Sequence, residues 1–192
     1  MIEINLKNEL NLNNIEKKVQ ALLESKEFYN FLGDKLLKEV KEITKQKVTG
    51  NVDIDSSRYA SANQKKVTSS YIKIFNDSLI TSADVDESFR EKFEQNYAGG
   101  LSLANIIEYG TGITGARSGA ASCVGDAEEK WTYDVNGHGS SGWTYSKNGR
   151  FYKTTGVEGK LVYHTLEERF KNKINQWAEE FINKHKKDLE DW

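Results

Sequence analysis

Apolar residues recur at steps of three and four along the first quarter of the chain. They run from Ile15 to Ile43, with lysine and glutamate residues between them. This spacing is typical of one face of an amphipathic helix, and it predicts a long helix over residues 14–47, which Ser25 restarts as an N-cap. Gly33 is expected to weaken this helix by about 1 kcal/mol relative to alanine. Ahead of it, alternating polar and apolar positions over residues 2–6 predict a short strand.

The pattern changes after the glycine at position 50. Over residues 52–80, β-branched and aromatic residues, Tyr59 among them, are punctuated by polar pairs. They predict two strands joined by a polar turn at residues 62–66. A helical period then returns over residues 84–97, and Asp84 is placed to cap its first turn.

A short stretch in the middle of the chain carries helix start and stop signals. Ser102 precedes an apolar run, and Gly110 follows it. We therefore predict a helix over residues 103–109, with its leucine and isoleucine side chains in the core. The many small residues at positions 112–121 show no periodicity and predict a mobile loop.

The last third of the chain combines aromatic residues with turn signals. Alternation predicts a strand over residues 131–135, and Asn148 followed by Gly149 predicts a β-hairpin. The final helix is predicted to begin with a capping box formed by Thr165 and Glu168. Its apolar stripe is the clearest in the chain and contains Leu166, Phe170, Ile174, Trp177, Phe181 and Ile182.

These elements predict an α+β fold. In it, long N- and C-terminal helices pack on a small mixed or antiparallel sheet, and a glycine-rich loop and a β-hairpin are inserted. The length of 192 residues is typical of one domain over residues 1–192, with residues 117–160 as an extended loop and hairpin region. No run of residues is apolar and long enough to predict a membrane span, and the N-terminal residues lack the pattern of a secretory signal.

Composition narrows the classes of function. The net charge of −2 and the isoelectric point near 6.0 argue against a protein that grips nucleic acid through many phosphates. Cys123 is the single cysteine, so one chain forms neither a disulfide nor a cysteine-rich zinc site. Residues 77–134 hold eleven acidic residues against four basic ones, which suits either a solvated face or a surface that repels polyanions.

One family resemblance rests on motifs spread over most of the chain. The sequence Ile-Ile-Glu-Tyr-Gly-Thr-Gly at residues 106–112 resembles the short helix and Glu-aromatic-Gly-Thr signature of the tail-completion, or head-to-tail joining, proteins of long-tailed bacteriophages. The Gly-Trp-Thr-Tyr run at 142–145, Gly-Arg-Phe at 149–151 and Thr-Gly at 155–156 are similar to later motifs of that family. The segment at 161–166 is similar to the start of its last helix, and the Thr-Gly turn at residues 49–50 to its first turn.

The resemblance implies a structural virion protein without catalysis, cofactor or metal. Such a subunit is made in the host cytoplasm and often assembles as a sixfold ring at the neck, between the head connector and the tail tube. DNA passes through the lumen without sequence-specific binding. The candidate contact residues are Glu108, Tyr109, Gly110, Thr111, Gly112, Trp131, Trp143 and Tyr145, and the candidate acidic residues of the lumen are Asp84, Asp86 and Glu87.

A second class of function remains open. A small phage-associated hydrolase or ligand-binding domain could use the glycine- and aromatic-rich hairpin as a cleft, with Cys123 and either His138 or His164 as a nucleophile pair. No local signature accompanies these residues. The Gly-Thr-Gly at residues 110–112 is too short for a phosphate loop and lacks the lysine that follows one. Glu108 is expected to brace a loop, because no second carboxylate has a motif spacing with it.

Overall fold

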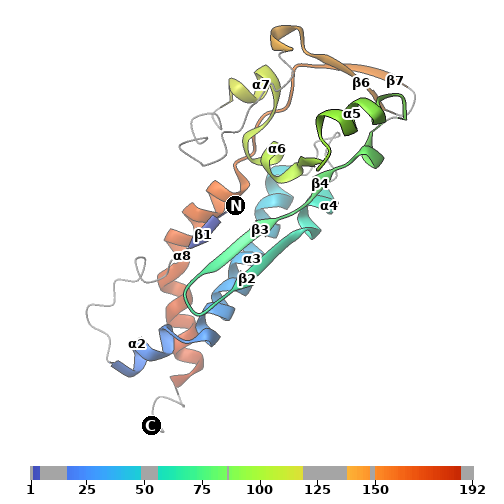
Figure 1. Cartoon of the computed structure of the whole chain (residues 1–192). Coiled ribbons are helices and arrows are strands. Elements are labelled where there is room, and N and C mark those ends of the chain that lie inside the picture. The colour runs from blue at the N-terminus through green and yellow to red at the C-terminus, as the bar shows by residue number, and fades with distance from the viewer. Residues whose placement is uncertain are drawn as a thin grey trace. The chain divides into compact units, whose positions relative to one another are not determined.

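The computed structural model describes residues 2–4, 17–48, 56–85, 87–118, 138–147 and 150–186 (Figure 1). The fold is mixed α+β, as the sequence predicts. Packing divides the chain into two compact units. The first comprises Met1–Gln46, Ala60–Asn76 and Tyr163–Trp192, and the second comprises Lys47–Tyr59 and Asp77–Val162. The single domain over residues 1–192 stays a prediction.

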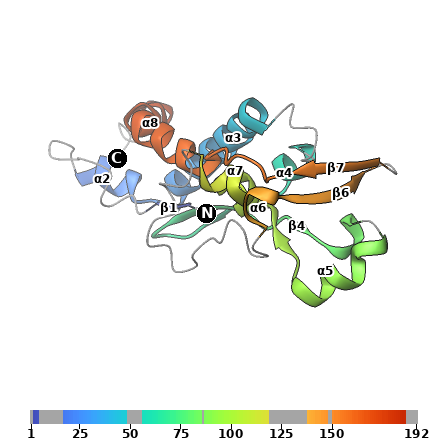
Figure 2. The same ribbon diagram turned by 90° about the horizontal axis from the view of Figure 1, so that it is seen from above.

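Two long helices form the framework of the first unit. Helix α3 spans Lys26–Val48 and helix α8 spans Val162–Lys184. The two helices lie side by side in both views (Figures 1 and 2). The predicted N-terminal helix is divided, because α2 covers only Lys17–Leu23. Ser25 restarts it as predicted, with its Oγ accepting a hydrogen bond from the backbone N–H of Phe28 at 3.2 Å.

Aromatic rings join the two long helices. The ring centroid of Phe181 lies 5.0 Å from that of Phe28 and 5.2 Å from that of Phe31. The predicted stripe of the last helix is confirmed, because five of its six residues are buried: Leu166, Phe170, Ile174, Trp177 and Phe181. Burial of this apolar stripe stabilises the first unit.

A half-buried carboxylate adds an ionic link between the same helices. Glu39 of α3 accepts hydrogen bonds from Lys173 at 2.5 Å and from Arg169 at 3.3 Å. Burial alone would raise the pKa of Glu39, but these two hydrogen bonds and the two positive charges outweigh it and lower the pKa. Glu39 is therefore held in its charged form.

Three strands cover α3 in an antiparallel sheet of order β1-β3-β2. They are β1 (Ile2–Ile4), β2 (Asn63–Val67) and β3 (Ile72–Asn76). The turn predicted at residues 62–66 is wrong, because those positions lie mainly in β2. The chain reverses at residues 68–71 instead, where the Thr68 hydroxyl accepts hydrogen bonds from the N–H groups of Ser70 and Tyr71.

Tyr59 and Gly33 also differ from the sequence prediction. Tyr59 is a buried residue of helix α4, Ser56–Ser61, and not of a strand. Gly33 sits where α3 meets β2, and a Cβ atom added there would lie 2.9 Å from Cγ2 of Val67. Close packing of helix on sheet therefore requires a glycine at position 33, although glycine lowers helix propensity.

In the second unit, two short strands pair in antiparallel orientation. They are β4 (Leu79–Ile80) and β5 (Leu101–Ser102). Between them lie the 3-10 turns η1 (Ser82–Asp84) and η2 (Glu87–Phe89) and the helix α5 (Arg90–Asn96). The helix predicted over residues 84–97 is therefore too long. Asp84 cannot cap it, because its carboxylate reaches back to the N–H and hydroxyl of Thr81 at 2.8 and 3.0 Å.

Two short helices and a hairpin complete the second unit. Helix α6 spans Leu103–Tyr109 as predicted. Helix α7 spans Gly112–Ala116, so the predicted mobile loop is wrong for these residues. The hairpin is confirmed, with β6 at Trp143–Lys147 and β7 at Arg150–Thr154, and η4 at Gly139–Ser141 precedes it. The strand predicted over residues 131–135 lies outside the described residues.

The start of α8 differs from the capping-box prediction. The helix begins at Val162, so Thr165 and Glu168 are already inside it. The preceding backbone is fixed by α6, because the N–H groups of Lys160 and Leu161 donate to the carbonyls of Ile107 and Glu108 at 2.7 and 3.1 Å. No helix among the described residues is long and apolar enough to cross a membrane.

Candidate assembly site at a glycine clasp

Helix α6 positions the Glu-Tyr-Gly-Thr-Gly sequence through its own ends. At its start, the Oγ of Ser102 accepts a hydrogen bond from the N–H of Asn105 at 3.2 Å. At its end, Gly110 adopts a φ of 84° and donates its N–H to the carbonyl of Ile106 at 2.8 Å. The left-handed φ turns the chain out of the helix, which is why glycine stands there.

The chain leaving α6 pairs with a segment more than forty residues away in the sequence. Thr111 donates its N–H to the carbonyl of Val157 at 2.9 Å, and Val157 donates back to Thr111 at 3.2 Å. One turn further, the Thr114 N–H donates to the Thr155 carbonyl at 3.2 Å, and their hydroxyls lie 2.9 Å apart. We call residues 110–112 together with residues 155–157 the glycine clasp.

The clasp requires glycine at two positions, because glycine has no Cβ atom. A Cβ atom on Gly112 would overlap the carbonyl of Thr155, and one on Gly156 would overlap the carbonyl of Thr111. Both glycines also have positive φ angles, 61° and 110°. The two segments therefore approach backbone to backbone, and α7 begins within this contact, at Gly112.

Trp143 fixes the base of the hairpin beside the clasp. A Cβ atom on Gly112 would lie 2.9 Å from Cζ3 of the indole, which marks a close contact. The His138 ring lies 5.4 Å from the indole. Trp143 is half-buried within its own unit, so the structure gives it an internal packing role. Its expected role as an interface anchor stays a prediction.

Glu108 is almost fully buried, with 4% of its surface exposed. It lies in α6, and its backbone carbonyl receives the N–H of Leu161 at 3.1 Å. This backbone hydrogen bond joins the end of α6 to the segment that precedes α8. The bracing role expected of the Glu108 carboxylate stays a prediction. Tyr109 and Thr111 beside it are half-buried. No three His, Cys, Asp or Glu residues in the described parts of the chain could hold a metal ion together.

The hairpin extends away from the clasp and α7 (Figure 2). Its register pairs Trp143 with Thr154 at the base and Tyr145 with Tyr152 near the middle. Phe151 is 75% exposed and Tyr152 is 42% exposed. Successive residues of a strand point to opposite faces, so each face of the hairpin exposes one large aromatic residue, and either face is a candidate contact surface. Sequence reasoning singled out Trp143 and Tyr145 on β6 and missed these two residues on β7.

No protein-family model, curated protein or solved structure matches this chain. The resemblance to tail-completion proteins therefore rests on its motifs. Four of those motifs meet at or next to the clasp: the run ending at residue 112, the Gly-Trp at 142–143, the Thr-Gly at 155–156 and the segment from residue 161.

The three candidate acidic residues of the lumen have different surroundings. Asp84 is paired with Arg58, whose Nη1 lies 2.6 Å from its Oδ1. The hydrogen bond from Arg58 is the main cause that lowers the pKa of Asp84. Glu87 is exposed in η2. Asp86 lies outside the described residues.

The structure describes two of the three residues proposed for the alternative hydrolase. His138 contacts Trp143 at the base of the hairpin. His164 lies in the first turn of α8, and its Nε2 is 3.8 Å from a carboxylate oxygen of Glu168 on the surface. Cys123 lies outside the described residues, as does Trp131 of the candidate contact residues. The nucleophile pair therefore stays a prediction.

Proposed function

We propose that this protein is a structural subunit of the head-to-tail junction of a long-tailed bacteriophage, acting as a tail-completion or tail-terminator protein. In this role several copies, six by the family resemblance, form a ring that joins the tail tube to the head connector and lets DNA pass. The observation that carries the proposal is the glycine clasp, where the motifs of the resemblance interlock through Gly110, Gly112 and Gly156.

The geometry suits a ring subunit. The second unit holds its clasp rigidly through reciprocal backbone hydrogen bonds between Thr111 and Val157. From that base the hairpin presents Phe151 and Tyr152 to the exterior. A two-stranded hairpin alone is only marginally stable, so exposed aromatic residues on it favour contact with another subunit or a neighbouring ring.

An acidic lumen fits the same role. A surface of like charge lets a polyanion slide without binding. Glu87 is an exposed acid that can act in this way, whereas Asp84 is already neutralised in part by Arg58. We therefore assign the repulsive role to Glu87 first, and to Asp84 chiefly a structural one.

Antibody labelling of intact virions tests the proposal. Gold-labelled antibody against this chain is expected at the junction of head and tail in electron micrographs. Labelling of the tail tip, the capsid surface or no part of the particle would rule the assignment out. Antibody against a tail-tube protein serves as the control for access, because it labels a known position on the same particles.

A further inference from the structure

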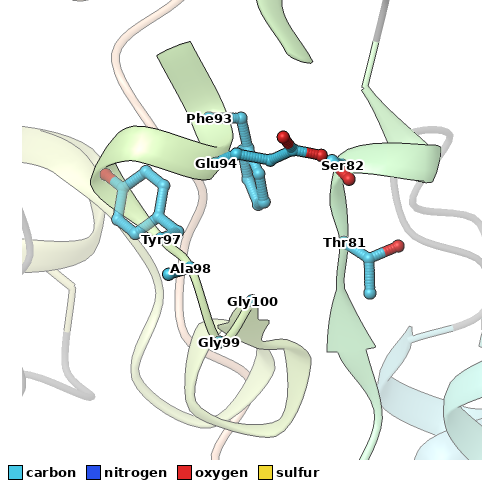
Figure 3. A pocket seen from close by; sticks show the side chains of 8 residues that line it. All are labelled: Thr81, Ser82, Phe93, Glu94, Tyr97, Ala98, Gly99 and Gly100. Carbon is cyan, nitrogen blue, oxygen red and sulfur yellow. The ribbon is translucent and has the colours of Figure 1, made fainter. Parts of the chain in front are cut away.

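A pocket of about 390 Å³ opens beside η1 and α5 in the second unit (Figure 3). Phe93 and Tyr97 line it with their rings, whose centroids are 5.2 Å apart at an angle of 48°. The Glu94 side chain extends toward Ser82 across the pocket. The volume lies near the lower end of ligand pockets, roughly 300–1,000 Å³. It therefore suits one side chain or a small molecule.

The chemistry of this pocket favours a cation. Glu94 supplies a carboxylate that has no ion-pair partner among the described residues. Two aromatic rings beside a carboxylate attract a positive group through the ring faces as well as through charge. A guanidinium group suits such a site best, because it stacks on rings and donates two parallel hydrogen bonds to a carboxylate.

The hairpin offers such a group. Residues 143–154 contain three basic residues and no acidic residue, a net charge of +3. Residues 82–100 contain five acidic and two basic residues, a net charge of −3. Arg150 is exposed on β7, directly beside Phe151, and no ion pair of Arg150 occurs among the described residues. The chain thus carries two exposed surfaces that are opposite in charge and rich in aromatic residues.

We propose that Arg150 of one copy of this chain enters the η1 and α5 pocket of the next copy, where its guanidinium binds Glu94 beside the packed rings of Phe93 and Tyr97. This inference rests on the proposed ring, and it identifies the contact that builds it. The hairpin and the pocket are different surfaces. The hairpin of each copy can therefore bind one neighbour while its pocket binds the hairpin of another. Contacts of this head-to-tail kind close into a ring when the rotation between copies allows it.

Charge reversal at both partners tests the contact. We would measure the assembly of wild-type protein, Glu94→Arg and Arg150→Glu by native mass spectrometry and sedimentation, alone and with purified tail tubes. Each single variant is expected to weaken self-association at least about tenfold. A mixture of the two single variants in equal amounts is expected to assemble again. In that mixture the native Arg150 of one variant meets the native Glu94 of the other, and the two substituted side chains also carry opposite charges.

Glu91→Arg is the matched control. Glu91 lies on the same helix, and the substitution changes the net charge equally, but Glu91 does not line the pocket. Assembly of Glu91→Arg within about twofold of wild type supports a specific contact. Loss of assembly equal to that of Glu94→Arg would instead attribute the effect to the charge of the whole segment, and would overturn the proposal.

Other outcomes separate this inference from the proposed function. If wild type assembles and both single variants assemble equally well, the ring stands and this contact is wrong. The double variant, Glu94→Arg with Arg150→Glu in the same chain, is measured alongside. If the mixture of single variants fails while this double variant assembles, the two groups meet within one chain, which also overturns the contact between copies. If wild type stays monomeric with and without tail tubes, the proposed function and this inference fall together.

Discussion

Thr111 and Val157 exchange backbone hydrogen bonds, at 2.9 Å in one direction and 3.2 Å in the other. This reciprocal pair ties the end of α6 to the segment that precedes α8. It also places Gly156 against the carbonyl of Thr111, with no space for a side chain between them. The base of the hairpin is held in consequence at a fixed position within the second unit.

Replacing Gly156 with alanine is expected to destabilise the protein by about 1–3 kcal/mol. The added Cβ meets the Thr111 carbonyl, and the φ of 110° is one that alanine rarely adopts. Urea unfolding followed by fluorescence measures the change. Gly99→Ala is the matched control, since nothing lies within 4 Å of the added Cβ atom there. Equal stability of the two variants would contradict the clasp.

The sign of the effect of Gly33→Ala separates helix propensity from packing. Propensity alone predicts a gain of about 1 kcal/mol. Because the new Cβ would lie 2.9 Å from Cγ2 of Val67, we expect a loss of about 1–3 kcal/mol instead. Thermal unfolding of Gly33→Ala, Val67→Ala and the double variant measures the coupling. A stabilised Gly33→Ala protein would show that the contact with β2 is unimportant.

Because the pKa of Glu39 is lowered, we expect its contribution to the free energy of unfolding to fall in acid. Its pKa is lowered from the usual 4.5 in the folded state, so its contribution is full above pH 4.5 and is lost as the pH falls through the lowered pKa. Glu39→Gln is expected to cost about 1 kcal/mol at pH 7. That difference should vanish near pH 2.

Urea unfolding at both pH values is the measurement for Glu39. Glu42→Gln is the control, because Glu42 is exposed on the same helix. A cost of Glu39→Gln that persists unchanged in strong acid would show that the ion pairs with Lys173 and Arg169 contribute nothing.

Glu87 and Asp84 should differ when their charges are reversed. Glu87→Lys is expected to leave the free energy of unfolding within about 0.5 kcal/mol of wild type, while slowing DNA ejection several-fold. Asp84→Lys is expected to lower stability, because it breaks the contacts with Arg58 and Thr81. Fluorescence of dye-bound DNA released from virions measures ejection. Normal ejection by assembled Glu87→Lys virions would refute the acidic lumen.

Local signals predicted some elements of this fold well. Helix α6 followed from Ser102, the apolar run and Gly110, because start, face and stop signals agree within a short stretch of sequence. The hairpin followed from Asn148 and Gly149 for the same reason. The stripe of α8 was clear because its buried positions keep one period over 23 residues.

Contacts between distant segments explain what sequence reasoning missed. Helix α7 has a sequence of small residues and forms where Thr114 and Gly112 meet the segment around Thr155. From sequence alone, Gly33 is only a weak position of the helix. The structure shows Val67 packed against it, which sequence does not reveal. The exposure of Phe151 was also hidden, since alternation along a strand does not tell which face is covered.

The most direct test of the ring is native mass spectrometry of the purified protein, first alone and then with purified tail tubes. Our account predicts complexes of six copies of this chain, either free or formed on the tubes. Phe151→Ser is expected to fold with the stability of wild type and to assemble less, because Phe151 is exposed in the single chain. A wild-type protein that remains monomeric and binds neither tubes nor head connectors would contradict the account.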